Sequence, residues 1–187
     1  IGYPVMIKAS SGGGGKGMRV ARDEEEFEFQ FNMAQRESAN AFGDDTMYIE
    51  RFVENPRHVE IQIMADTQGN VVALGERDCS VQRNHQKLIE ESPSPAITEE
   101  TRQKMNEYAI LAAKTVNYTN AGTIEFIVSP KGEFFFMEMN TRIQVEHGVT
   151  EMVTGTDLII EQIRVAMGEP LSFTQEDVRP RGHAIEC

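Results

Sequence analysis

The chain has 187 residues, 40% of them hydrophobic, and its 18 basic and 30 acidic residues leave a net charge of -12. This acidic balance argues against nucleic acid or an anionic membrane surface as the main partner. No apolar run approaches the roughly 18 residues of a membrane span, and no stretch resembles a signal peptide. Two cysteines, Cys79 and Cys187, are too few for a disulfide framework, so a reducing, cytoplasmic location is expected.

The first fifty residues predict a small α/β unit. Residues 5–10 and 18–21 have the composition of strands, and a glycine loop joins them. Asp23 begins a capping-box pattern, and Phe27 and Phe31 follow at helical spacing, so a helix is expected to begin there.

The rest of the chain predicts mostly antiparallel sheet and two helices. Strands are expected at residues 47–53, 58–65, 71–76, 122–129 and 133–140. A Pro- and Ser-rich segment at residues 93–95 has the composition of a linker. Thr98 is expected to cap a long helix whose apolar stripe comprises Met105, Tyr108, Ala109, Ala112 and Val116. A last helix is expected from a Thr156 cap to Gly168.

These elements indicate an α+β fold with a smaller part at residues 1–52 and a larger part at residues 53–187. The chain begins without Met and ends on residues that resemble an unfinished strand. We therefore expect it to be a piece of a longer protein.

The glycine loop is the first candidate site. Its spacing matches the dinucleotide fingerprint, but that motif must open a helix, whereas a strand is predicted to follow here. The P-loop pattern also fails, because Ser10 and Gly17 occupy the places of its first Gly and its Ser or Thr. A cluster of backbone N–H groups with one lysine remains, which suits phosphate oxygens, and a disordered hairpin tip is the alternative. The loop consists of Gly12, Gly13, Gly14, Gly15, Lys16 and Gly17.

A second candidate site is a pair of carboxylates on the predicted hairpin at residues 122–140. If residues 130–133 form a four-residue loop, Glu125 faces Glu138 across the ladder, with Cβ atoms about 5 Å apart. Two like charges at that separation need a cation between them, and Mg²⁺ with phosphate oxygens is a suitable one. A loop of different length would offset the pair, and a merely solvated pair is the alternative.

Two polar runs complete the candidates. In an extended segment Arg142, Gln144 and Glu146 share one face, where Arg could hold a small oxyanion and Glu could accept a proton. Upstream, His85 and Lys87 suit phosphate or ribose hydroxyls.

Together these motifs closely resemble the biotin carboxylases, a family of ATP-grasp enzymes. The resemblance covers essentially the whole chain and rests on IKASSGGGGKGMRV, NPRHVEIQ, ERDCSVQRNHQK and FMEMNTRIQVEH. Within the family, the run KLIEESPSP is more similar to the acetyl-CoA carboxylase subunit than to pyruvate carboxylase. The resemblance implies that residues 1–52 form a mobile lid and residues 53–187 part of the catalytic core.

The resemblance also implies roles for individual residues. Nucleotide-binding positions are Lys8, the glycine loop, Glu50, Arg51, Val53, His58, Gln82 and His85. Metal positions are Glu125, Glu138 and Asn140. The bicarbonate pocket is Lys87, Arg142, Gln144 and Val145. Catalysis is assigned to Glu146 as general base, with Arg142 and Lys87 beside it.

The implied reaction is phosphorylation of bicarbonate by ATP with Mg²⁺ or Mn²⁺, followed by transfer of CO₂ to biotin on a carrier protein or domain. A homodimer of the full-length protein is implied, and a domain before Ile1 and an arginine after Cys187 are expected to complete it. We therefore expect this stretch alone to be inactive. The alternatives are another ATP-grasp ligase, such as a carbamoyl-phosphate synthetase, and a non-catalytic nucleotide-binding module.

Overall fold

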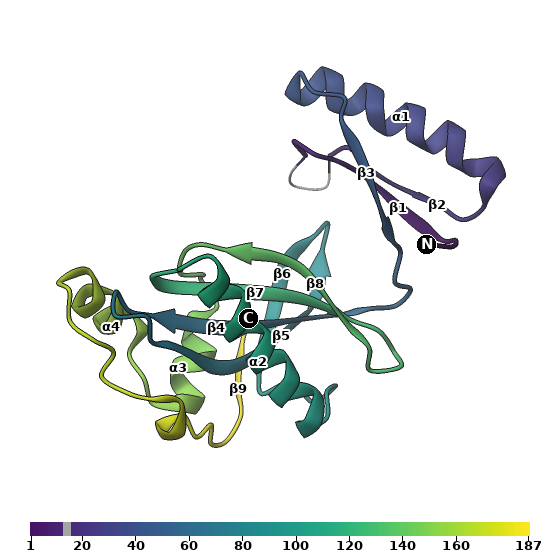
Figure 1. Ribbon diagram of the computed structural model, residues 1–187. Helices are drawn as coiled ribbons and strands as arrows, with labels where there is room; N and C mark the ends of the chain where they lie inside the picture. The colour runs from purple at the N-terminus through teal and green to yellow at the C-terminus, as the bar shows by residue number, and fades with distance from the viewer. Residues whose placement is uncertain (13–15) are drawn as a thin grey trace. The chain divides into compact units, whose positions relative to one another are not determined.

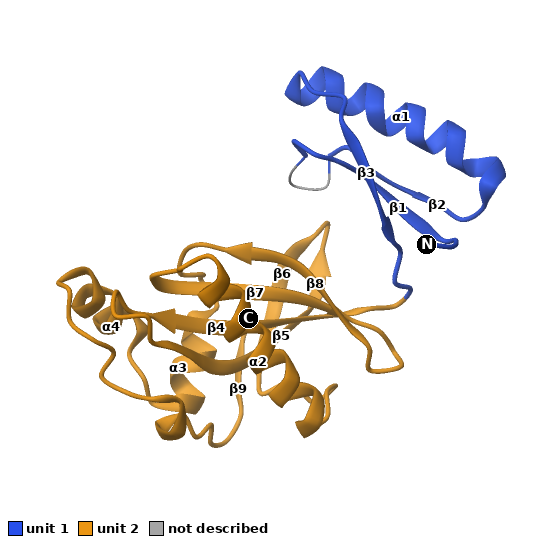
Figure 2. Cartoon of the chain, viewed as in Figure 1, with its two compact units in different colours: residues 1–54 blue, residues 55–187 orange. Residues whose placement is uncertain are grey.

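The computed structural model describes residues 1–12 and 16–187, so Gly13, Gly14 and Gly15 lie outside the described residues. The chain divides into two compact units, Ile1–Glu54 and Asn55–Cys187 (Figure 2). This boundary lies two residues beyond the one expected from the sequence. The roles of lid and core for the two units stay predictions.

The smaller unit is a three-stranded antiparallel sheet with one helix on it (Figure 1). The sheet has the order β2-β1-β3, from Met18–Ala21, Val5–Ala9 and Met47–Arg51. Helix α1, Glu24–Phe42, begins as predicted, with the Asp23 carboxylate accepting from the N–H of Glu26. The core joins Val5, Ile7 and Ala21 to Ala34 of α1, with Phe27, Phe31 and Met47 packed around them.

Gly17 has a local structural reason to be glycine. Its φ is +71°, in the left-handed region, and a Cβ there would lie 2.8 Å from Cβ of Ala9. The same turn brings the N–H of Ala9 to the carbonyl of Gly17 at 3.0 Å. A side chain at this position would therefore open the hairpin that carries the glycine loop.

The larger unit is built on a six-stranded antiparallel sheet with the order β8-β7-β4-β5-β6-β9 (Figure 1). The strands are β4 Arg57–Ala65, β5 Val71–Arg83, β6 Gln86–Ser92, β7 Asn120–Val128, β8 Phe134–Asn140 and β9 Ala184–Glu186. The helices are α2 Glu99–Thr115, α3 His147–Thr154 and α4 Leu158–Ala166, with a 3-10 turn at Gln175–Asp177. Among the described residues, no helix is both long and apolar enough to cross a membrane.

Side chains of β4 point alternately into two separate hydrophobic cores. Val59, Ile61 and Ile63 face α2, where they pack against Met105 and its neighbours. Met64, from the other side of the strand, packs with Leu158 and Val165 of α4. Because successive side chains of a strand point to opposite faces, Glu60 and Gln62 lie on the same side as Met64. Both are fully buried.

Three expectations for the larger unit are corrected. Ser94 is buried and its hydroxyl donates to Asp78 at 2.8 Å, so residues 93–95 belong to the packed unit and are no linker. Helix α2 buries Ala113 with Met105 and Ala109, whereas Tyr108 and Val116 are exposed. The cap of α4 is Asp157, one residue after Thr156, because its carboxylate accepts the N–H of Ile160. Strand β6 and helix α3 were not predicted, and β5 continues to Arg83, beyond the expected end at residue 76.

Candidate functional site

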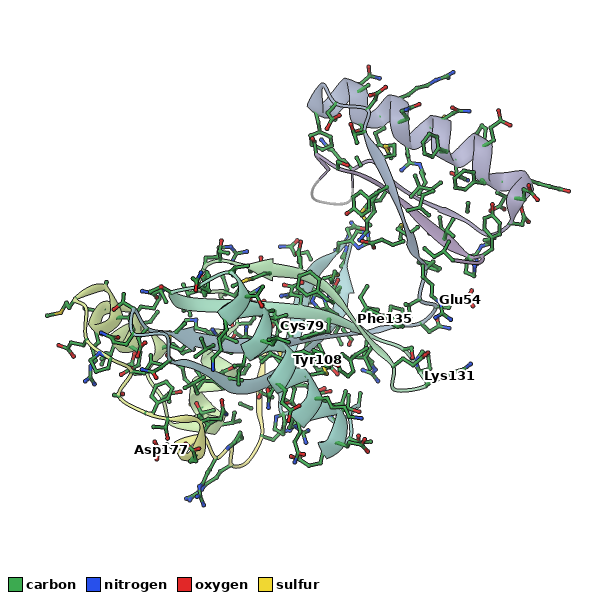
Figure 3. The ribbon with its side chains drawn as sticks, viewed as in Figure 1. Glu54, Cys79, Tyr108, Lys131, Phe135 and Asp177 are labelled. Atoms are coloured by element: carbon green, nitrogen blue, oxygen red, sulfur yellow. The ribbon has the colours of Figure 1, made fainter. Side chains whose placement is uncertain are left out.

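A charged cluster lies under α3 on the sheet of the larger unit. The strands β4, β5, β6 and β7 contribute Glu60, Arg77, Lys87 and Glu125, and the segment before α3 contributes Gln144 and Glu146. Arg77 and Glu60 are fully buried, with Arg77 Nε and Glu60 Oε1 2.6 Å apart. Cys79, labelled in Figure 3, follows two residues after Arg77 on β5. Burial raises the pKa of its thiol, which therefore stays protonated.

Lys87 lies at the centre of three carboxylates. Its Nζ is 2.6 Å from Glu60 Oε2, 2.7 Å from Glu146 Oε1 and 3.1 Å from Glu125 Oε1. Burial alone would lower the pKa of Lys87, but Glu60 and Glu146 outweigh burial and hold that pKa above its usual value. Lys87 is therefore charged at neutral pH and holds these carboxylates together.

Glu60 is the most deeply buried of these carboxylates. Burial alone would raise its pKa, but Arg77 and Lys87 outweigh that effect and lower it. With Glu125 and Glu146, the cluster gathers three carboxylates around Arg77 and Lys87, and His58 lies against Glu125. Carboxylate oxygens gathered in this way suit a divalent cation.

Glu125, like Lys87, contacts several other side chains of the cluster. Its Oε1 accepts from Asn140 Nδ2 at 2.8 Å and Gln144 Nε2 at 3.1 Å, in addition to Lys87. Burial alone would raise the pKa of Glu125, but His58 and Lys87 lower it to about 2. Glu125 therefore remains a carboxylate under any physiological condition and is available to a metal ion.

His58 lies against the same carboxylate. Its Nε2 is 2.8 Å from Glu125 Oε2, although the two atoms are not aligned for a hydrogen bond. Gln82 Nε2 donates to His58 Nδ1 at 2.6 Å and to the carbonyl of Cys79 at 2.7 Å. Because Nδ1 accepts this bond, a neutral His58 carries its proton on Nε2, toward Glu125. Ligand atoms of His58, Glu60 and Glu125 all lie within 4.8 Å of one another.

The hairpin pairs Glu125 with Glu138 as predicted, but by a different route. Val128 pairs with Phe134, so the loop has five residues rather than four, and a bulge after Glu125 restores the predicted partner. Glu125 is buried, whereas Glu138 is exposed. Among the described residues, Glu138 belongs to none of the groups of three acidic, His or Cys side chains close enough to share an ion. Its role as a metal ligand stays a prediction.

The segment from Asn140 to Glu146 does not put its three predicted site residues in one environment. Gln144 and Glu146 are buried, but Arg142 is exposed and donates to the neighbouring carbonyl of Ile143 at 3.1 Å. Gln144 and Glu146 thus share a buried environment, and the expectation that Arg142 lies on the same face stays a prediction. Val145, between the two buried residues, is 83% exposed.

The three predicted nucleotide residues of the larger unit, His58, Gln82 and His85, differ in their contacts. His85 is exposed in the turn between β5 and β6, where it and Asn84 have positive φ. Gln82, by contrast, contacts His58 as described above. The cluster thus includes two of the three predicted nucleotide positions in this unit.

In the smaller unit, two predicted nucleotide residues contact each other. Lys8 Nζ lies 2.6 Å from Glu50 Oε2, with 16% and 43% of the two side chains exposed. Lys16 and Arg51 are exposed, and Val53 follows the end of β3. Gly12 closes a turn on the carbonyl of Ala9 at 3.0 Å, and Gly13, Gly14 and Gly15 lie outside the described residues.

Sequence reasoning missed Glu60 and Arg77. The signal for Glu60 was its place between the β-branched residues Val59 and Ile61 of a strand, because a charged residue in a buried strand needs a partner. For Arg77 the sequence held no comparable signal, since acidic residues flank it on both sides and suggest a surface position.

Comparison with known proteins identifies the family to which this chain is similar. The family described as carbamoyl-phosphate synthase L chain, ATP binding domain, matches residues 1–174. A biotin carboxylase of Nostoc sp. is 62% identical over 187 residues, which is 100% of this chain and 42% of that protein. The crystal structure of a biotin carboxylase–beta-gamma-ATP complex from Campylobacter jejuni has a TM-score of 0.94 at 53% identity, covering 100% of this chain and 42% of that one.

A further solved structure is the biotin carboxylase domain dimer of the Hydrogenobacter thermophilus 2-oxoglutarate carboxylase in complex with MgADP, ADP and bicarbonate. It has a TM-score of 0.93 at 52% identity and covers 100% of this chain and 41% of that one.

The chain belongs to the family of carbamoyl-phosphate synthase L chain ATP-binding domains. Within that family it has the fold of the biotin carboxylases, so the prediction of an α+β ATP-grasp fold is confirmed. The chain spans about two fifths of the length of these relatives.

Proposed function

We propose that this chain is the ATP-binding part of a biotin carboxylase, which uses MgATP to phosphorylate bicarbonate and then carboxylates biotin. The observation that carries the proposal is the contact of Lys87 with Glu146 at 2.7 Å inside a buried cluster of carboxylates. An ammonium held beside a potential proton acceptor suits an oxyanion substrate that must also lose a proton.

Glu146 is the general base of the proposal. It is 8% exposed and is the N-cap residue of α3, but its side chain makes no capping bond to that helix. Its Oε1 accepts from Lys87 at 2.7 Å, which leaves Oε2 as the oxygen that would accept a proton. Lys87 orients the carboxylate and offers positive charge to the bicarbonate oxygens, together with Gln144 and the exposed Val145.

Arg142 is the second cation of the proposed bicarbonate pocket. Its side chain is exposed and donates only to a neighbouring carbonyl among the described residues, so it can turn toward an anion at little energetic cost. Arg142 therefore completes the pocket by moving, whereas Lys87 is already in place.

The buried carboxylates fit a divalent cation. Glu125 is ionised, His58 and Glu60 lie close to it, and Asn140 contacts it, so oxygen ligands of the type that Mg²⁺ prefers are gathered here. Glu125, Glu138 and Asn140 would hold the ion. When bound, Mg²⁺ or Mn²⁺ would neutralise charge on the phosphoryl group that is transferred.

The smaller unit supplies the proposed phosphate contacts. Lys8 is paired with a half-exposed carboxylate of Glu50, which a phosphate can replace as its partner. The glycine loop and Lys16 add backbone N–H groups and a further positive charge. Glu50, Arg51 and Val53 provide the proposed adenine-contacting segment, with His58, Gln82 and His85 as further nucleotide contacts.

The finer assignments are also proposals. The acceptor of the second half-reaction is biotin on a carrier protein or domain, and the run at residues 87–95 supports an acetyl-CoA carboxylase, although one similar structure belongs to a 2-oxoglutarate carboxylase. We further propose a homodimer of the full-length protein in the cytoplasm, in keeping with its two free cysteines.

The test is ATP hydrolysis by the full-length protein. We expect ADP release to depend on bicarbonate and to accelerate with free biotin. Ammonia in place of biotin distinguishes the alternative, because a carbamoyl-phosphate synthetase would respond to ammonia. Nucleotide binding without any bicarbonate-dependent turnover would instead support a non-catalytic module.

A further inference from the structure

Arg77 is fully buried, and every one of its N–H groups has an acceptor. A guanidinium presents five N–H donors in a rigid, planar fork. Here the five donors reach five different side chains, at the distances Glu60 2.6 Å, Gln62 2.7 Å, Gln144 2.9 Å, Thr150 3.0 Å and Thr123 3.3 Å. Such a set fixes the group in a single orientation and leaves no donor for a substrate.

Two of these acceptors flank Glu146. Gln144 precedes it by two residues and Thr150, in the first turn of α3, follows it by four. The backbone between them lies outside the strands of the sheet, where a turn closed by the N–H of His147 on the carbonyl of Gln144 at 3.3 Å leads directly into α3. The guanidinium of Arg77 therefore connects both sides of Glu146 to strand β5.

The guanidinium of Arg77 also determines which atoms of Glu60 and Gln144 remain for other contacts. Arg77 takes Glu60 Oε1, which leaves Oε2 for Lys87 at 2.6 Å. Arg77 also donates to the side-chain oxygen Oε1 of Gln144. The side-chain nitrogen Nε2 of Gln144 therefore points toward Glu125, to which it donates at 3.1 Å. Both orientations place hydrogen-bonding groups around Lys87 and Glu125.

We propose that Arg77 is a positioning residue for bicarbonate phosphorylation, because it holds Gln144 and Thr150 and thereby keeps Glu146 within hydrogen-bond distance of Lys87. This inference rests on the proposed function. Arg77 contacts neither Lys87 nor Glu146 and acts only through the side chains that it holds. Its positive charge alone does not fulfil this role, because the geometry requires five donors in a plane.

The test is Arg77→Lys in the full-length protein, which keeps the charge opposite Glu60 but has three donors. Misplacement of a catalytic group by about 1 Å can cost on the order of 10²-fold in rate. We expect kcat for bicarbonate-dependent ATP hydrolysis to fall about 10- to 100-fold, with the KM for MgATP within about twofold. The matched control is Arg102→Lys, since Arg102 pairs with Glu76 at 2.8 Å on the α2 side of the unit. A folded Arg77→Lys variant with kcat within about twofold of the unmodified protein would overturn the proposal.

A second pair of variants decides the question if Arg77→Lys does not fold. Thr150→Val and Thr123→Val each remove one buried hydroxyl acceptor of the same guanidinium with little change in shape. Thr123 lies on β7, which β4 and β8 hold in the sheet, whereas Thr150 lies on α3. We expect Thr150→Val to reduce kcat several-fold more than Thr123→Val. Equal effects of the two substitutions would contradict positioning through α3.

Amide hydrogen exchange separates this inference from the proposed function. In Arg77→Lys, or in Thr150→Val, residues 144–150 should exchange faster than in the unmodified protein, while β7 should not change. Unchanged exchange at residues 144–150 would overturn the positioning role of Arg77, whatever the activity of the variant. Absence of bicarbonate-dependent hydrolysis in the unmodified protein would instead overturn the proposed function, and exchange would then decide whether Arg77 positions Glu146.

Discussion

The predicted site residues of the two units differ in how they are held. In the larger unit, Lys87, Glu125, Gln144 and Glu146 are joined by short contacts to one another and to the fully buried Glu60 and Arg77. In the smaller unit, Lys8 and Glu50 form a single pair with one half-exposed partner. In the proposed function, the groups assigned to chemistry are thus held in place by the protein itself. The groups assigned to phosphate binding can exchange one partner for another.

The largest expected effect on stability is at Glu60. Glu60→Leu leaves the Arg77 charge buried without a counter-ion, and breaking a buried ion pair costs about 3–5 kcal/mol. Denaturant titration of the full-length protein measures this loss. The control is Ile61→Val, next along β4 on the opposite face, for which about 0.5–1.5 kcal/mol is expected. A loss at Glu60 no larger than at Ile61 would show that the cluster does not stabilise the larger unit.

A smaller loss of stability is expected when the pH is lowered. The pKa of Glu125 in the folded protein is about 2, below its ordinary value of 4.5. Because the folded-state value is the lower one, this stabilisation is present above about pH 4.5 and is lost as the pH falls toward 2. It amounts to roughly 3 kcal/mol at neutral pH, since one pKa unit corresponds to about 1.4 kcal/mol.

The measurement is the free energy of unfolding of Glu125→Gln and of the unmodified protein between pH 7 and pH 2. The two curves should differ at pH 7 and converge near pH 2. The control is Glu133→Gln, in the exposed turn of the same hairpin. Its free energy of unfolding should equal that of the unmodified protein at every pH. A difference at Glu125 that is independent of pH would contradict the assigned ionisation.

The smallest effect is expected in the smaller unit. Lys8→Met removes the pair with Glu50, and a partly exposed ion pair contributes about 1 kcal/mol or less. The stability of the full-length protein should therefore hardly change, whereas the Kd for MgATP should rise. The same denaturant titration and a nucleotide-binding isotherm provide the two readouts. A stability loss comparable to that of Glu60→Leu would remove the contrast between the units.

Local signals predicted much of the fold and part of the site. The cap at Asp23, the strands on both sides of the glycine loop and the hairpin that pairs Glu125 with Glu138 all depend on residues close in sequence. Helix α3 was not predicted because its residues include Gly148 and several β-branched side chains, which have low helix propensity. In the folded protein, tertiary packing overrides that preference.

The central pair of the cluster could not be predicted in the same way. Glu60 and Arg77 lie 17 residues apart on neighbouring strands. Their pairing requires the register of β4 with β5, which is interrupted by a bulge between Ile61 and Ile63. Register of this kind depends on the whole sheet and not on any one stretch of sequence.

The most direct test of the account is carboxybiotin formation by Glu146→Gln in the full-length protein, measured with labelled bicarbonate, MgATP and free biotin. The substitution keeps the shape of the side chain and removes the proton acceptor beside Lys87. Loss of a general base typically costs on the order of 10² to 10⁴ in rate, so turnover should fall by that factor while the Kd for MgATP stays within about twofold. Turnover close to that of the unmodified protein would contradict the claim that the Lys87–Glu146 pair is the site of bicarbonate activation.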